Sequence, residues 1–394
     1  MTRRCSPAPI DAATKPARVR QARAPCRANR TPAVRAGLLV AVAAAAVALS
    51  AGCTNPPLIA HSVDTPPLVL TTARQAGVDD KRARFREVYC AVLEAHGRDL
   101  PDYRACDDAL TRLGAEPAGS GRAVDLGPSK RRLVAALVPG IGFDCIAKWL
   151  TPAGTVADQV RKFGFDLVSI KVDALSGTSK NARQIRDAVM AMDMGPGAPR
   201  LVLVGYSKGT PDVLDAVVSY PEIRDRIAAV VSVAGAVGGS ALAINAEQYQ
   251  AELLQHFPGA ACDPGDGGGV ASLRPAVRQA WLAQHLLPAG VRYYSFVTLP
   301  QPERISSILG GSYRKLSQID GRNDRQVIFY DQVIPAGTLA GYLNADHWAI
   351  ALPIARQHST VGSLFVTQNA YPREALTEAI LRFVEEDLAA TNAR

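Results

Sequence analysis

The sequence predicts an α/β fold in which a mostly parallel sheet is flanked by helices. From residue 131 onward, short uninterrupted apolar runs recur, and amphipathic helical patterns separate them. Strands of a parallel sheet are buried on both faces, so they appear as continuous apolar runs. A third observation is a Gly-x-Ser-x-Gly pattern between one such run and the next helix, which indicates where chemistry would take place.

The first 53 residues have the composition of a bacterial export signal. Nine basic residues and one acidic residue within residues 1–35 account for the whole net charge of +8, so the rest of the chain is neutral. The overall charge is therefore no reason to expect a nucleic-acid partner. An apolar stretch follows and ends in "LSAGC", which resembles a lipoprotein lipobox with Cys53 as the lipidated residue.

We therefore expect an exported, membrane-anchored lipoprotein that faces the periplasm or the cell surface. An uncleaved alanine-rich anchor helix is the alternative. Residues 54–80, rich in Pro, Thr and Ala, are predicted to form a tether. Residues 81–130 form a helical N-terminal extension, in which apolar residues at helical spacing predict a hairpin over 81–113.

Four cysteines remain after the leader and Cys53, and an exported protein can join them in disulfides. Cys90 and Cys106 flank the turn of the predicted hairpin, which favours a Cys90–Cys106 bridge and leaves Cys145–Cys262 as the second pair. Four cysteines allow three pairings, and four buried thiols are the alternative. The sequence contains no spacing typical of a Cys/His metal site, so we expect no metal and no cofactor.

Residues 131–394 supply the predicted sheet and its helices. The insertion 236–290 is expected to form a cap over the pocket, and 299–323 is a second insertion. The expected strands are 132–140, 166–173, 200–207, 227–235, 291–298 and a weaker 338–345. The expected helices are 154–163, 180–192, 210–220 and 372–390.

The stretch "RLVLVGYSKGTPDVLDAVV" has the three parts of a nucleophile elbow: an apolar strand, a tight turn and a helix. Such a turn exposes a serine above the sheet, here Ser207, and the two glycines leave room for it. The alternative is a structural strand-to-helix turn in a binding protein. A neutral serine is a poor nucleophile, so the elbow interpretation requires a histidine base and a carboxylate that orients it.

His347 is the candidate base because it directly follows the last expected strand. An ordinary loop histidine is the alternative for this position. The acid is expected between Ser207 and His347 in chain order. The segment "DGRNDRQVIFYDQVIP" offers Asp324, in an Asn-Asp pair typical of a tight turn, and Asp331, which lies closer to the last strand. We prefer Asp324 and keep Asp331 as the rival.

Two backbone N–H groups are needed to stabilise the oxyanion. One is expected from Lys208, next to the nucleophile. The other is expected from Ile141, between two glycines in the loop "VPGIGFDC" after the first strand. A plain glycine turn is the alternative for that loop.

Together these residues resemble the α/β-hydrolase fold, and within it the bacterial lipases and esterases, over roughly residues 131–390. "GYSKG" matches the elbow, "LVPGIGFD" is similar to the lipase oxyanion loop, and "ADHWAIALP" is similar to the histidine loop. The resemblance implies a triad of Ser207, Asp324 and His347. Departures are Lys208 after the serine, Arg325 in place of the glycine of the acid turn, and Pro139 in place of the histidine of the oxyanion loop. They argue against triglyceride lipase activity more than against hydrolase chemistry.

We expect a serine hydrolase that cleaves carboxylic esters, of small molecules or lipids, through an acyl-enzyme. A thioesterase, acyltransferase or peptidase would use the same triad. The alternative from another class is a non-catalytic periplasmic lipoprotein that keeps the fold as a binding scaffold. The ammonium of Lys208 leaves one question open: it either selects anionic substrates or pairs with a nearby carboxylate, and we favour the pairing.

Overall fold

The computed structural model describes residues 77–131, 133–146, 154–193, 200–245 and 263–392. The export signal, Cys53, most of the tether and Cys262 lie outside these residues, so the predictions made for them stay predictions. Within the described part of the chain, no helix is both long and apolar enough to span a membrane.

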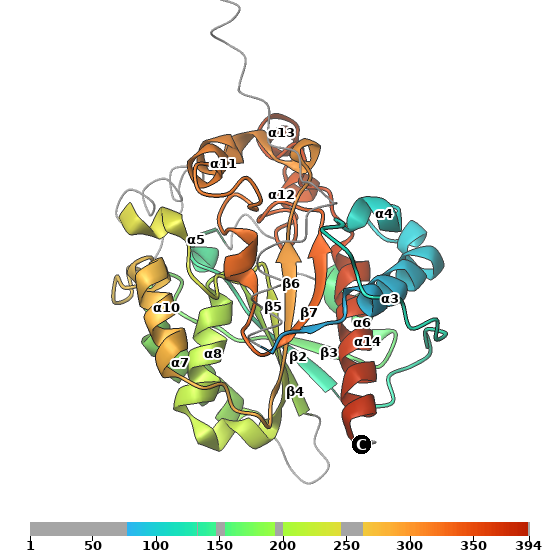
Figure 1. Ribbon diagram of the computed structural model, residues 1–394, viewed down its shortest axis with the longest axis horizontal. Coiled ribbons are helices and arrows are strands. Elements are labelled where there is room, and N and C mark those ends of the chain that lie inside the picture. The colour runs from blue at the N-terminus through green and yellow to red at the C-terminus, as the bar shows by residue number, and fades with distance from the viewer. Residues whose placement is uncertain (1–76, 132, 147–153, 194–199, 246–262, 393–394) are drawn as a thin grey trace, which may run out of the picture. The chain divides into compact units, whose positions relative to one another are not determined.

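The fold is built on a seven-stranded sheet in which all neighbouring strands are parallel, as predicted (Figure 1). The order across the sheet is β1-β7-β6-β5-β4-β2-β3, so the chain changes direction beside β2 and β4. The six predicted strands are confirmed, each within its expected range. The strands are β1 (Asp79–Asp80), β2 (Leu133–Val138), β3 (Asp166–Ser169), β4 (Arg200–Tyr206), β5 (Ile227–Val233), β6 (Arg292–Thr298) and β7 (Thr338–Leu343).

Successive side chains along each strand point to opposite faces of the sheet, so alternate residues are buried in two separate cores. On β4, Val202 and Val204 belong to one core, whereas Leu201 and Leu203 belong to the other. Helices cover the two faces separately (Figure 1). On the first face lie α3 (Arg82–Ala95), α6 (Gly154–Arg161) and α14 (Arg373–Asn392); on the second lie α7 (Thr178–Ala191), α8 (Gly209–Ser219) and α10 (Pro275–Gln284).

The N-terminal extension packs directly on the sheet. Asp79 and Asp80, assigned to the tether from sequence, pair with β7 as an edge strand. The ring of Phe85 on α3 then meets those of Phe296 on β6 and Phe383 on α14, with centroids 4.7 and 5.7 Å apart. The extension therefore completes the core on this face.

The first arm of the predicted hairpin is helical, but the second arm contains a single turn, α4 (Cys106–Ala109). The chain then extends, because Leu110 forms an antiparallel bridge with Leu343 and the N–H of Thr111 donates to the carbonyl of Tyr342. Pairing with the end of β7 takes precedence over local helical spacing here.

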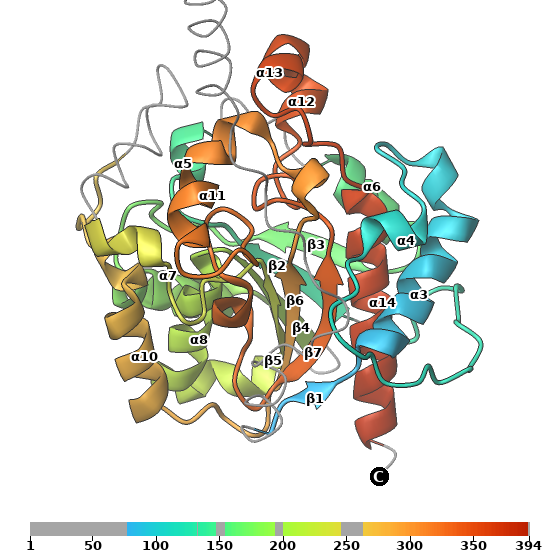
Figure 2. The ribbon, with the colours of Figure 1, turned by 45° about the horizontal axis from the view of Figure 1, so that its top comes forward.

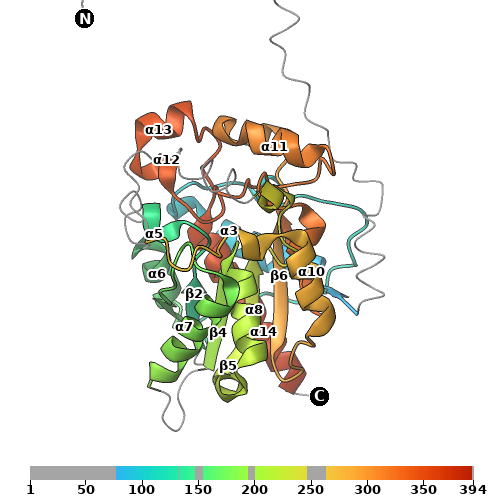
Figure 3. The same cartoon turned by 90° about the vertical axis from the view of Figure 1, so that its left-hand side faces the viewer.

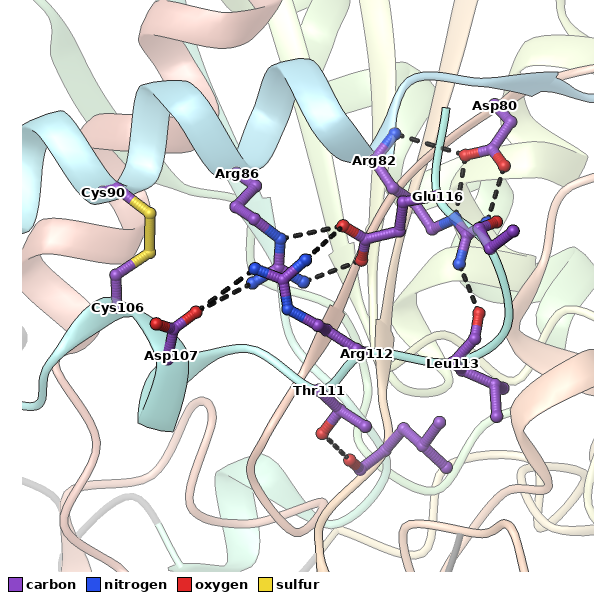
Figure 4. Close-up of polar contacts among 12 residues, drawn as sticks. Asp80, Arg82, Arg86, Cys90, Cys106, Asp107, Thr111, Arg112, Leu113 and Glu116 are labelled. Atoms are coloured by element: carbon purple, nitrogen blue, oxygen red, sulfur yellow. Dashed lines mark hydrogen bonds and ion pairs between the residues drawn. A yellow bond between two sulfur atoms is a disulfide. The ribbon is translucent and has the colours of Figure 1, made fainter. Parts of the chain in front are cut away.

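A disulfide joins Cys90 on α3 to Cys106 on α4, the first of the two predicted pairs (Figure 4). Beside it, Arg86 forms an ion pair with Glu116, and Arg82 forms one with Asp80. These contacts fasten α3 to α4, to the segment that follows α4 and to β1, respectively. The second predicted pair includes Cys262 and so lies partly outside the described residues.

Short helices lie beyond the carboxyl ends of the strands (Figures 1 and 2). They are α11 (Gly310–Ser317), α12 (Ile354–Gln357) and α13 (Ser359–Leu364), and α5 (Phe143–Ile146) follows β2. The described helix of the 236–290 insertion, α10, instead runs alongside α8 (Figure 3). Segments 299–323 and 354–364 thus also lie at this edge of the sheet, and because residues 246–262 of the predicted cap lie outside the described part, the cap stays a prediction.

Candidate active site

Ser207 lies in a sharp turn between β4 and α8, at the carboxyl edge of the sheet. Its φ is +53°, a left-handed conformation that non-glycine residues adopt at few positions. Its N–H donates to the carbonyl of Val233 on β5, and its carbonyl accepts from Thr210 at 3.1 Å. The strand and the first helical turn therefore hold the serine in a strained conformation, as an elbow requires.

Both glycines of the Gly-x-Ser-x-Gly pattern are required because backbone atoms of other residues lie where a Cβ atom would be. A Cβ atom on Gly205 would lie 2.5 Å from the Cα of Thr210, and one on Gly209 would lie 2.2 Å from the carbonyl oxygen of Val138. Neither neighbour is a flexible side chain, so a larger residue would push α8 away from the sheet. The pattern is thus explained by packing of helix on strand.

The structure brings the three predicted side chains together in one line of hydrogen bonds. His347 Nε2 lies 2.9 Å from Ser207 Oγ, and His347 Nδ1 lies 2.7 Å from Asp324 Oδ2. All three side chains are buried. Because an ionised carboxylate can only accept, Nδ1 carries the proton, and the lone pair of Nε2 faces the serine hydroxyl. This arrangement can move a proton from Ser207 to the imidazole.

The carboxylate of Asp324 is held by further donors besides His347. Its Oδ1 accepts the backbone N–H of Gln326 at 3.0 Å and that of Val327 at 2.7 Å. Its Oδ2 accepts the hydroxyl of Thr298, at the end of β6, and Nε2 of Gln332 at 3.3 Å. The orientation of this carboxylate is therefore fixed by two backbone and two side-chain donors.

The rival carboxylate, Asp331, lies elsewhere. Its side chain packs over Gly238, where a Cβ atom would come within 2.4 Å of Oδ1. Burial raises the pKa of Asp331 from 3.8 to about 7. The residue next to it, Gln332, is the one that reaches Asp324, because neighbouring side chains of this short turn point in different directions.

The loop that carries His347 is anchored from several sides. The backbone N–H of His347 donates to the carbonyl of Asp324, and its carbonyl accepts the hydroxyl of Tyr206, the residue before the nucleophile, at 2.7 Å. Just upstream, Asn344 donates its N–H to Ala109, and its carbonyl accepts Nη1 of Arg104. The base therefore depends on the elbow, the acid turn and the N-terminal extension for its position.

The loop after β2 lies against the nucleophile. A Cβ atom on Gly140 would lie 2.9 Å from Cβ of Ser207 and 3.3 Å from its Oγ, so only glycine fits. The neighbouring N–H of Ile141 and the N–H of Lys208 meet no acceptor among the described residues. Their predicted role as donors to an oxyanion stays a prediction.

The ammonium of Lys208 is fully engaged in an ion pair. Its Nζ lies 2.8 Å from both oxygens of Asp212, one helical turn onward, and both side chains are buried. Asn181 on α7 donates to the same carboxylate at 2.8 Å. Desolvation by burial raises the pKa of Asp212 even though Lys208 opposes that shift. The pairing predicted from sequence is confirmed, and this charge faces the protein interior.

Arg325, which follows Asp324 directly, presents a different case. Its φ is +82°, and its side chain is buried, with the guanidinium over the ring of Tyr313 at 5.0 Å. Within the described part of the chain, its Nε and Nη1 meet no hydrogen-bond acceptor. Desolvation lowers the pKa of this guanidinium to about 10.

Sequence reasoning missed several residues that support the site: Asp212, Thr298 and Gln332. Asp212 had a readable signal, because it lies four residues after Lys208 on a helix, where opposite charges meet. Thr298 and Gln332 had none, since they reach Asp324 across separate elements. Among the residues that the structure describes, no group of His, Cys, Asp or Glu is arranged to hold a metal ion.

In comparisons with known proteins, no family model matches the chain, and no curated protein matches it. Among solved structures, the metagenomic carboxyl esterase MGS0156 is 40% identical with a TM-score of 0.75, covering 82% of this chain and 97% of the other. The Bacillus licheniformis lipase BlEst2 in its mature form is 21% identical, with a TM-score of 0.47 and coverage of 58% and 89%. The Staphylococcus hyicus lipase is 11% identical, with a TM-score of 0.49 and coverage of 70% and 100%.

Proposed function

Because this chain belongs to the carboxyl esterase family and hydrolyses carboxylic esters, we propose that it does so through a triad of Ser207, His347 and Asp324. One observation carries the proposal: a continuous line of hydrogen bonds, 2.9 and 2.7 Å long, joins the three buried side chains. A base within hydrogen-bond reach of the nucleophile, itself oriented by a carboxylate, is the arrangement that activates a neutral serine.

In the first half of the reaction, Ser207 Oγ attacks the ester carbonyl carbon while His347 Nε2 takes the hydroxyl proton. The tetrahedral intermediate collapses as the bond to the alcohol oxygen breaks, and the imidazolium gives its proton to that oxygen. An acyl-enzyme on Ser207 remains. Water then attacks the acyl carbon, His347 takes the water proton, and release of the acid returns that proton to Ser207.

The oxyanion is stabilised by the N–H groups of Ile141 and Lys208. Both lie beside Ser207, one in the loop that touches its side chain and one on the next residue. Fixed N–H donors favour the charged intermediate over the neutral ester, since the charge develops only along the reaction path. The buried ion pair of Lys208 with Asp212 supports this role, because it ties the side chain of the donor residue to α8.

The substrate is proposed to be a carboxylic ester of a small molecule or a lipid. We further propose that the enzyme is exported and held at a membrane by a lipid on Cys53, as the lipobox-like sequence predicts. Labelling with a palmitate analogue tests the anchor. Cys53→Ala should abolish labelling, whereas Cys26→Ala should leave it unchanged; labelling that persists in Cys53→Ala contradicts this site.

The triad is tested by labelling the purified enzyme with a fluorophosphonate and locating the adduct by mass spectrometry. We expect one adduct on Ser207 in the wild type and none in Ser207→Ala, whose turnover of a chromogenic ester should fall roughly 10⁴- to 10⁶-fold. Ser219→Ala, at the end of α8, is the matched control and should behave as wild type. An adduct that survives Ser207→Ala would contradict the assignment.

Thioesterase and acyltransferase activities would use the same residues. They are distinguished by supplying one acyl group as an oxyester and as a thioester, with and without an added alcohol acceptor. We expect the oxyester to give the higher kcat/KM and water to be the main acceptor. A clear preference for the thioester, or transfer to the alcohol in place of hydrolysis, would change the reaction class while leaving the triad intact.

A further inference from the structure

Arg325 is a buried cation that the proposed ester chemistry does not use. Its side chain lies between the acid turn and α11, and 3% of its surface is exposed. Buried charges in proteins are ordinarily paired, because the desolvation of an unpaired ion is costly. Arg325 forms no ion pair with any residue that the structure describes, and its Nε and Nη1 have no acceptor there.

A second guanidinium lies close by. A Cβ atom on Gly310, the first residue of α11, would lie 3.5 Å from Nη1 of Arg314 and 3.8 Å from Nη1 of Arg325. The two cations are therefore near neighbours across a position that has no side chain. Arg314 is exposed, whereas Nη1 of Arg325 is buried. The Coulomb repulsion of Arg314 acts on Arg325 and contributes to the lowered pKa of the latter.

Two acidic groups, Asp346 and Asp324, face Arg325, and their Coulomb attraction opposes the lowering of its pKa. Their oxygens accept hydrogen bonds from other donors. Asp346 is buried and accepts the N–H groups of Ser306, Trp348 and Ala349 at 2.9 to 3.1 Å, and it forms no ion pair with Arg325. Asp324 is held by His347 and its other donors. Neither carboxylate therefore supplies a hydrogen-bond acceptor to Nε or Nη1 of Arg325.

We propose that Arg325 and Arg314, with the first turn of α11 between them, form a binding site for an oxyanion, a phosphate or carboxylate group. A guanidinium presents parallel N–H groups that match two oxygens of such a group. The amino end of α11 adds the partial positive charge of the helix dipole. Bound water would satisfy Nε and Nη1 of Arg325, whereas an anion would also oppose the repulsion between the two guanidinium groups.

The site also explains why an arginine stands at this position of the turn. A φ of +82° favours glycine, and Arg325 holds it at the cost of backbone strain. Backbone strain and a buried charge without an ion-pair partner both destabilise the fold. A bound anion would offset the charge, which is the pattern expected of a residue kept for binding.

Binding is measured by isothermal titration of the whole enzyme with inorganic phosphate, at constant ionic strength so that general screening does not change. We expect saturable binding at one site. Arg325→Gln should weaken it about tenfold or more, since charge-assisted hydrogen bonds are lost. Arg314→Gln should weaken it by a smaller factor. Arg322→Gln is the matched control, because Arg322 lies in the same turn but is paired with Asp320, and it should bind as wild type.

Thermal unfolding supplies an independent readout. Phosphate should raise the Tm of the wild type and leave that of Arg325→Gln unchanged. Arg314→Gln alters an exposed side chain and keeps the test usable whatever the folding yield of Arg325→Gln. Absence of saturable binding to the wild type, as expected for a site that holds only water, overturns the proposal. Equal binding by wild type and Arg325→Gln overturns it as well.

The source of the oxyanion is distinguished with two esters of similar size, p-nitrophenyl butyrate and p-nitrophenyl hemisuccinate. This arm rests on the proposed ester hydrolysis, whereas the phosphate titration does not. If the anionic group belongs to the substrate, Arg325→Gln raises the KM of the hemisuccinate about tenfold and spares that of the butyrate. If the site takes a free anion, both esters respond alike to the variant, and phosphate binding is still lost.

Discussion

The turn that carries Ser207 and the turn that carries Asp324 are built from similar parts. Each holds a non-glycine residue at positive φ, +53° at Ser207 and +82° at Arg325. Each also buries a cation beside the triad. Lys208 is bound by Asp212 at 2.8 Å, whereas Arg325 has no ionic partner in the described part of the chain. The cation of the elbow is thus paired within the protein, whereas the cation of the acid turn has no ion-pair partner in the described residues.

The largest effect that would test this comparison concerns the acid turn. Asp324→Asn should lower kcat about 10⁴-fold, because an amide stabilises the wrong tautomer of His347 and cannot stabilise its imidazolium. Asp331→Asn is the matched control and should retain most of the activity, since Asp331 lies over Gly238. Initial rates on a chromogenic ester measure both. Loss of turnover in Asp331→Asn alone would transfer the role of the acid to Asp331.

The next largest effect concerns the paired cation of the elbow. Lys208→Met should destabilise the protein by about 3–5 kcal/mol in urea unfolding, because it leaves Asp212 buried and unpaired. The double variant Lys208→Met with Asp212→Leu should recover most of that stability, since apolar replacement of a buried pair is often neutral. A double variant as unstable as the single one would show that the unpaired charge is not the cause.

The third prediction concerns Asp331 and the dependence of stability on pH. Its pKa is about 7 in the folded protein and about 3.8 when unfolded. Between these values the folded state holds the proton more tightly, so this group stabilises the fold at low pH and that contribution is lost as pH rises to 7. Asp331→Asn should remove this slope and be more stable than wild type at pH 8, by about 1–2 kcal/mol. Melting temperatures from pH 4 to 8 measure it; parallel curves would contradict it.

The smallest effect isolates the backbone strain at Arg325. Arg325→Gly and Arg325→Ala both remove the guanidinium, but only glycine adopts φ of +82° without cost. The glycine variant should therefore be more stable than the alanine variant by about 1 kcal/mol. Chemical unfolding of the pair measures the difference. Equal stability would mean that the turn relaxes around the alanine.

The elbow could be predicted from the sequence because its causes are local. The apolar run of β4, the two glycines and the first turn of α8 all lie within residues 200–212, and the close approaches to Thr210 and Val138 explain each glycine. The parallel strands could be predicted for the same reason, since burial on both faces leaves a continuous apolar run. Even the Lys208–Asp212 pair could be read from its helical spacing.

The acid turn could be predicted only in part because its causes are distant in sequence. The choice between Asp324 and Asp331 depends on where Thr298 and Gln332 point, and those contacts cross separate elements. The strand β1 and the extended segment after α4 were missed because both form only by pairing with β7. The catalytic roles and the lipid anchor remain predictions that the experiments above address.

The anchoring of the histidine loop to the N-terminal extension has a consequence for the order of folding. Asn344 bonds Ala109 and Arg104, partners that lie more than 200 residues upstream. Contacts of such long sequence separation carry a high loop-closure entropy and tend to form late. Residues 104–109 must therefore meet the loop after β7 before His347 is held opposite Ser207. We therefore expect ester turnover to recover late in refolding, after the secondary structure of the sheet has formed. Removing the disulfide between Cys90 and Cys106 should delay that recovery further.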